Sequence, residues 1–174
     1  KYNYEPRNSY EQQYVYYPTT DVEKIRNDVS LSALKGLAMK LGGLREGRKS
    51  IIVLSEGYSD YVPPQLRDQS AGGVGQRSAM RYNPRAGMSR YEETQALFQD
   101  MGMRANLVYT ADIANRNNTS FYMVDPRGLA VWEYDMSTVP IDHETDQRML
   151  RDLQSTLYVL ADESDGRAII NRND

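Results

Sequence analysis

The sequence contains no cysteine and a single histidine, His143. Without cysteine there is no disulfide framework, no thiolate zinc site and no cysteine nucleophile. One histidine leaves little material for a catalytic constellation, and His143 stands in a charged run before an expected helix, where such residues usually serve the helix dipole. No apolar run approaches the roughly eighteen residues needed to cross a bilayer. These absences exclude a membrane span and argue against most enzyme classes.

Glycine-rich and serine-based motifs are equally weak. Gly72-Gly73-Val74-Gly75 is not followed by the Lys-Ser or Lys-Thr of a phosphate-binding loop. No serine stands in a Gly-x-Ser-x-Gly elbow. We therefore expect a protein that is not an enzyme.

The formal net charge of -3 is unevenly distributed. Residues 1–90 carry 14 basic and 9 acidic side chains, and residues 91–174 carry 7 and 15. The basic side chains that cluster at all lie in a loop without helix or strand periodicity: Arg67, Arg77, Arg81, Arg85 and Arg90. A nucleic-acid binder would gather its positive charge on one face, so we expect no nucleic-acid partner.

The first nineteen residues are rich in tyrosine. Six tyrosines stand among Asn, Gln and Pro with no sustained periodicity, so residues 1–19 are expected to be irregular. Tyrosine combines an apolar ring with a hydrogen-bonding tip. The segment could pack on its own domain or contact another chain, and Tyr14, Tyr16 and Tyr17 are the candidate partner-binding residues.

Helices and strands alternate along the rest of the chain. Thr20 with Glu23 forms a capping box before an apolar helical pattern that Gly42-Gly43 ends, and a short apolar strand follows at 50–54. A long loop is expected at about 58–88. A single helix, or a pair of helices separated at Gly102, extends to about residue 116 and leads to a strand at 119–124. A third helix from about 145 leads to a strand at 167–171.

Short apolar strands joined by helical crossovers predict an α/β fold, a three-layer Rossmann-like sandwich with a mostly parallel central sheet. The unbroken run Ser50–Leu54 predicts a central strand that is covered on both faces. Three strands are few for such a sheet. The chain also starts at Lys1 without a signal-peptide pattern. We therefore expect a domain cut at both ends, with edge strands and any secretion signal lying outside it.

Several segments resemble bacterial von Willebrand factor type A (vWA) domains of the acidobacterial kind. Leu31–Gly57, LSALKGLAMKLGGLREGRKSIIVLSEG, resembles the helix, turn and central strand of that family. Asn115–Leu129, Leu157–Asp174 and Tyr10–Pro18 agree in order and spacing. The resemblance implies a partial vWA-like domain over residues 20–174, in a secreted or cell-envelope bacterial protein. It also implies an extracellular or periplasmic location.

The resemblance also implies a degenerate metal-ion-dependent adhesion site. The family's Asp-x-Ser-x-Ser motif is absent, the Thr or Ser ligand falls near Asp28 or Ser30, and Ser55-Glu56-Gly57 stands in place of Thr-Asp-Gly. The candidate metal ligands are therefore Ser30, Ser55 and Glu56. Mg²⁺ or Ca²⁺ is expected only in the intact parent domain, because Mg²⁺ requires a near-octahedral set of oxygen ligands.

Two functions remain from different classes. The first is a non-catalytic module for protein–protein interaction or adhesion, whose partner docks where the loops after Leu54 and Val124 lie. The second is a structural subunit of an extracellular assembly, in which sheet edges and the tyrosine-rich segment engage neighbouring chains. Both predict a protein partner, and the second predicts self-association.

Overall fold

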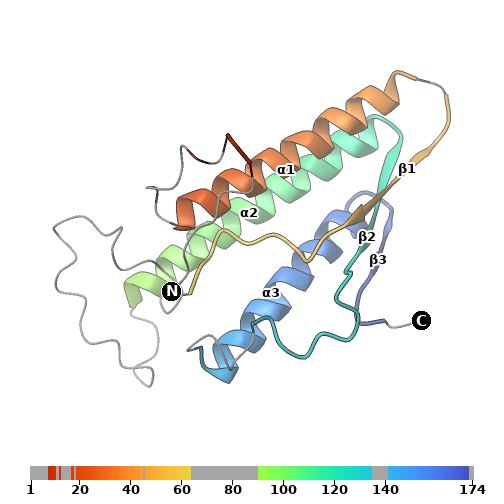
Figure 1. Ribbon diagram of the computed structural model, residues 1–174. Helices are drawn as coiled ribbons and strands as arrows, with labels where there is room; N and C mark the ends of the chain where they lie inside the picture. The colour runs from red at the N-terminus through yellow and green to blue at the C-terminus, as the bar shows by residue number, and fades with distance from the viewer. Residues whose placement is uncertain are drawn as a thin grey trace.

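The computed structural model describes residues 8–10, 12, 17, 19–44, 46–63, 90–134 and 141–172. Three helices and three strands alternate in these residues (Figure 1). In chain order they are α1 (Thr19–Gly42), β1 (Lys49–Leu54), α2 (Arg90–Arg116), β2 (Thr119–Val124), α3 (His143–Asp162) and β3 (Arg167–Ile169). The predicted α/β alternation is confirmed. The predicted loop from 58 lies within the described residues only as far as Pro63, and that part has neither helix nor strand.

The first helix starts one residue before the predicted cap and ends at the predicted glycine pair. Val22, Leu31 and Ala38 are completely or almost completely buried. Val29 and Leu37 continue the apolar helical pattern in the sequence, but they are 64% and 42% exposed. The pattern therefore overestimates the buried side of this helix.

The other two helices differ slightly from the prediction. The second helix continues through Gly102 without a break. The third starts two residues earlier than expected, because the Asp142 side chain accepts a hydrogen bond from the Thr145 backbone N–H at 2.9 Å and so caps it. Asp142 therefore serves the helix start, as charged residues before a helix usually do.

The three strands form a parallel sheet in the order β1-β2-β3. Lys49 to Leu54 pair in register with Thr119 to Val124, and Tyr122 to Val124 pair with Arg167 to Ile169. The strand expected to be central is thus an outer strand of the described sheet, and β2 is the central one. The predicted burial of both its faces is also wrong, since Ile52 is 69% and Leu54 70% exposed.

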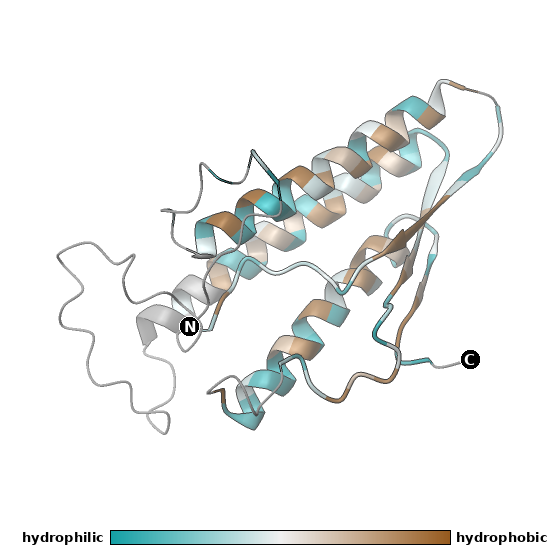
Figure 2. Cartoon of the chain, in the orientation of Figure 1, coloured by the Kyte–Doolittle hydropathy of each residue, from teal (hydrophilic) through white to brown (hydrophobic). Residues whose placement is uncertain are grey.

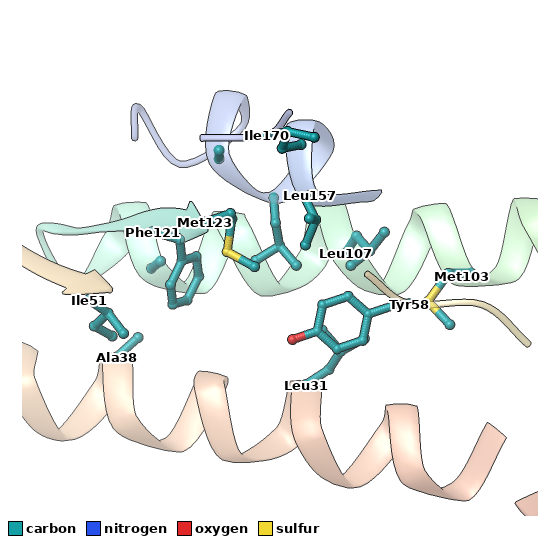
Figure 3. Close-up of a cluster of buried hydrophobic side chains, with 13 residues drawn as sticks. Leu31, Ala38, Ile51, Tyr58, Met103, Leu107, Phe121, Met123, Leu157 and Ile170 are labelled. Carbon is teal, nitrogen blue, oxygen red and sulfur yellow. The ribbon is translucent and has the colours of Figure 1, made fainter. Parts of the chain in front are cut away.

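All three helices pack on one face of the sheet (Figure 1). Side chains at odd-numbered positions of β1 and β2, Ile51, Phe121 and Met123, lie in one core cluster with residues of every helix (Figure 3). Successive right-handed crossovers in one direction along a sheet place the connecting helices, α2 and α3, on the same side, and α1 packs against α2. The described residues therefore form two layers, and the third layer of the predicted sandwich is not among them.

Candidate functional site

The loops that follow β1 and β2 meet at the carboxyl ends of the strands, where the sequence predicted a ligand crevice. Arg127 connects them. Its Nε and Nη2 donate to the two carboxylate oxygens of Asp125 at 2.9 and 2.8 Å, and Nη2 also donates to the backbone carbonyl of Glu56 at 2.8 Å. Its Nη1 pairs with the carboxylate of Glu133. A guanidinium of this chain thus holds the two loops together.

Arg127 and its two carboxylate partners are largely removed from water. The Asp125 side chain is 0% exposed, and those of Arg127 and Glu133 are 15% and 12% exposed. Burial alone raises the pKa of Asp125, but hydrogen bonds and the charge of Arg127 outweigh it and hold that pKa below its usual value. Burial raises the pKa of Glu133, and Arg127 offsets this only in part. The cluster therefore depends on the guanidinium.

A buried carboxylate fixes the next part of the loop to α3. Asp146 is fully buried and accepts hydrogen bonds from the backbone N–H groups of Glu133 and Tyr134, the latter at 2.8 Å. His143 is exposed at the helix start, and its ring meets Trp132 edge-on with centroids 4.6 Å apart. Asp142 and Asp146, two acidic residues near His143, thus have structural partners.

The predicted metal ligands lie in different surroundings. Ser30 is exposed on α1. Ser55 is half-buried after β1, and its hydroxyl accepts a hydrogen bond from the Gly57 N–H at 3.2 Å. Glu56 is exposed, and its backbone carbonyl is the acceptor from Arg127.

Arg127 takes the position beside Asp125 that a divalent cation would need in order to bind this carboxylate. The Asp125 carboxylate accepts from Arg127 at both oxygens, and the guanidinium already supplies positive charge there. Among the residues that the structure describes, no group of three or more His, Cys, Asp or Glu side chains is placed to hold a metal ion. The assignment of Ser30, Ser55 and Glu56 as ligands stays a prediction.

Arg127 was not among the residues predicted from the sequence. The spacing of Asp125 and Arg127, two residues apart, is the one local signal that points to their pairing. The other partners, Glu56 and Glu133, are 71 and 6 residues away from the arginine in sequence. Only the parallel pairing of the strands brings all of them together.

The predicted tyrosine contact lies mostly outside the described residues. Tyr14 and Tyr16 are not among them, and Tyr17 is 50% exposed. The role of these tyrosines in partner binding stays a prediction.

The sheet face opposite the helices is open and apolar. We call it the open sheet face and define it by four exposed side chains, which belong to all three strands: Ile52 at 69%, Leu54 at 70%, Tyr122 at 36% and Ile169 at 40% exposure. The strand register puts Ile52 beside Tyr122 and, one step on, Leu54 and Ile169 beside Val124. Hydrophobic residues continue along the strands in Figure 2. The run Ser50–Leu54, which predicted a strand covered on both faces, thus has one exposed face.

Basic side chains border this face, with Arg48 at the amino-terminal end of the strands. Arg167 is exposed and stands beside Tyr122 in the register. Arg48 donates from Nε to the Ser120 hydroxyl at 2.8 Å and pairs with Asp165 at 3.1 Å. At the other end of the strands, the exposed Glu56 and Arg172 have opposite charges. Arg167 therefore adds a positive charge beside Tyr122 and in line with Ile52, in the middle of the six-residue strands β1 and β2.

Two shallow cavities of about 350 and 310 Å³ lie on the helical side and share Asp60 and Met103. Each cavity is lined by three acidic side chains and one basic side chain among other polar groups. Burial raises the pKa of Asp60. The Asn27 side chain already donates to Asp60 at 3.0 Å. These contacts explain Asp60 without a ligand.

Comparisons with protein-family models, with curated proteins and with solved structures found no match to this chain. None of the helices in the described residues is both long enough and apolar enough to cross a bilayer.

Proposed function

We propose that this chain is a non-catalytic protein–protein interaction module whose partner covers the open sheet face. The observation that carries the proposal is the exposure of Ile52 and Leu54, which are 69% and 70% accessible in the middle and at the end of a parallel strand. Parallel sheets are normally covered on both faces, and contiguous exposed apolar patches mark interaction sites. Burying each of these side chains contributes about 1.5–3 kcal/mol to association before entropic costs.

The proposal includes the vWA-type identity and the extracellular or cell-envelope location that the sequence resemblance implies. An α/β domain with a small, open, parallel sheet is compatible with that family. Adhesion through a bound metal is not part of the proposal, because Arg127 already supplies a cation at the carboxyl ends of the strands.

Photo-crosslinking tests the proposal. A crosslinking amino acid replaces Leu54 on the open sheet face, and a matched control replaces Leu97, which is 57% exposed on α2. Both proteins are irradiated in the envelope fraction of the source cells. We expect a discrete adduct from position 54 that is absent from position 97 and is lost when Ile52→Asp is added. Equal adducts from both positions, or none from position 54, would contradict the proposal.

A structural subunit is the second candidate, and one observation favours it. Within the described residues, β1 and β3 each pair on one side only, so each presents an open edge. Unpaired edges are templates for pairing with another chain. Light scattering over a range of concentrations separates the two candidates, because an assembly subunit forms open-ended oligomers without a partner and an interaction module does not.

A further inference from the structure

One side of α2 presents apolar residues to the outside. Met101, Ala105 and Val108 recur at spacings of four and three residues, so they share one side of the helix. Met101 is 58% and Val108 37% exposed, whereas Met103 and Leu107, which face the core, are at most 5% exposed. Since α2 already packs against α1, α3 and β2, this exposed side is the one that these elements leave uncovered.

Charged residues are arranged symmetrically about Val108. We call five residues that lie four apart along the helix the α2 row: Asp100, Arg104, Val108, Asp112 and Arg116. The first two are exposed, and Asp112 and Arg116, which pair at 2.8 Å, are 44% and 75% exposed. The signs along the row are negative, positive, uncharged, negative and positive. In reverse order every charged position has the opposite sign, so the row is complementary to a reversed copy of itself.

This symmetry selects a second copy of the chain as the occupant of the exposed side. In an antiparallel pair centred on Val108, Arg104 of one copy lies beside Asp112 of the other, and Asp100 lies beside Arg116. A parallel pair in the same register would place each charge beside its own copy and bring like charges together. A lipid surface favours basic residues beside apolar ones, whereas acidic and basic residues are equal in number in the α2 row.

Helix geometry allows the antiparallel contact. Rows of residues four apart are the ridges through which two helices most often interdigitate, at a crossing angle of about −50°. Val108 then lies at the crossing, and the small side chain of Ala105 beside it permits a close approach of the two helices. Arg104 and Asp112 lie one turn to either side of the crossing. A two-fold contact uses the same patch on both copies, so it closes at two copies.

We infer that α2 binds α2 of a second copy of this chain, antiparallel and centred on Val108, to form a closed two-fold dimer. This inference goes beyond the proposed function and does not depend on it. All three helices pack on one face of the sheet, so α2 and the open sheet face lie on opposite sides of the sheet (Figure 1). The dimer therefore leaves the open sheet face free for its partner.

Two charge reversals test the inference by sedimentation equilibrium of the full chain. The wild-type mass should rise from 19.9 kDa towards twice this value with concentration and then level off. Arg104→Glu and Asp112→Lys should each weaken the dimer by about tenfold or more, because each creates two like-charged contacts across the two-fold axis. An equimolar mixture of the two variants should dimerise about as tightly as the wild type, because every contact then joins opposite charges.

A matched charge reversal on the other side of the sheet gives the control. Arg167→Glu makes the same change in net charge as Arg104→Glu at an exposed position of β3, and it should leave the dimer unchanged. Val108→Asp should abolish the dimer, because it places two carboxylates at the crossing of the helices. Circular dichroism checks that each variant is folded, which is expected because all the substituted side chains are exposed or partly exposed.

The remaining outcomes overturn the inference. A wild-type chain that stays at 19.9 kDa up to its highest soluble concentration has no such dimer. If the two charge-reversed variants remain monomeric when mixed, the antiparallel register about Val108 is wrong. If Ile52→Asp abolishes self-association and Val108→Asp does not, the copies meet through the open sheet face. Growth beyond two copies would assign the contact to the open strand edges instead.

Discussion

Arg127 is the single side chain on which the carboxyl edge of the sheet depends. It is the partner of Asp125 and Glu133 and the donor to the Glu56 carbonyl. Removing one member of a buried ion pair leaves an uncompensated charge, and this usually costs more than the pair contributes.

Replacing Arg127 with methionine should therefore lower the free energy of unfolding by about 3 kcal/mol, because Asp125 remains buried without its cation. Urea unfolding followed by circular dichroism measures the change. Arg116→Met is the control, since Arg116 and Asp112 form an exposed pair on α2 whose loss should cost less than about 1 kcal/mol. Equal effects of the two substitutions would show that the cluster has no special role.

Asp125 also makes stability depend on pH. Its pKa is lower in the folded chain, so the stability it contributes is fully present above its unfolded pKa of about 3.9 and is lost as the pH falls through the folded value. Asp125→Asn removes this contribution, so its unfolding free energy should fall less steeply below about pH 4 than that of the wild type. Denaturant titrations at a series of pH values provide the comparison.

Glu133 should change the stability with pH in the direction opposite to Asp125. Burial raises its pKa, so it costs stability at neutral pH, and this cost is relieved as the pH falls through the raised value. Glu133→Gln should therefore leave the steep acid limb in place. An acid limb that persists in Asp125→Asn would assign the pH dependence to other carboxylates.

The turn from α3 to β3 lies so close to β2 that there is no room for a side chain at Gly166. A Cβ at Gly166 would lie 1.8 Å from the Phe121 carbonyl oxygen of β2, and backbone atoms cannot yield as a flexible side chain does. The close approach lets β3 join β2 immediately after the helix.

Gly166→Ala should consequently destabilise the protein by more than about 2 kcal/mol, because β2 and β3 must separate or α3 must shift. Gly36→Ala is the matched control. Gly36 lies within α1 with nothing within 4 Å of an added Cβ, so that substitution should stabilise the helix by about 0.5–1 kcal/mol. Thermal unfolding of the two variants should thus shift in opposite directions, and a shared direction would refute the packing argument.

Strand positions followed from the sequence, but the place of each strand in the sheet did not. The prediction of 119–124 matched β2 residue for residue, because this segment stands between the polar residues that end at Asn118 and the turn pair Asp125-Pro126. For Ser50–Leu54 the same kind of run predicted cover on both faces, and β1 has only Ile51 buried. The burial of a strand depends on which elements pack against it in the folded chain, and a run of apolar residues does not encode that.

In the candidate site, too, local contacts could be predicted from the sequence and long-range contacts could not. Asp142 as a helix cap depends on residues three apart and could be predicted. The contacts of Arg127 join residues up to 71 positions apart, so they required the strand register. The open sheet face required knowing that all the helices of the described chain lie on one side.

At the scale of the whole molecule, the described residues of the tyrosine-rich start, 8–10, 12 and 17, are exposed and lie outside the core. The buried apolar residues run from Val22 to Ile170, and none precedes Val22 in the described chain. Residues 1–18 should therefore be removable without loss of the α/β core.

A chain lacking residues 1–18 should unfold cooperatively, with a midpoint within a few degrees of the full chain, as measured by circular dichroism. It should also give the same crosslinked adduct from position 54, because the open sheet face lies on β1, β2 and β3. If the full chain self-associates and the truncated chain does not, the tyrosine-rich segment makes the contact between copies and the structural-subunit hypothesis gains its interface. If truncation abolishes cooperative unfolding, the segment belongs to the core and the predicted boundary at residue 19 is wrong.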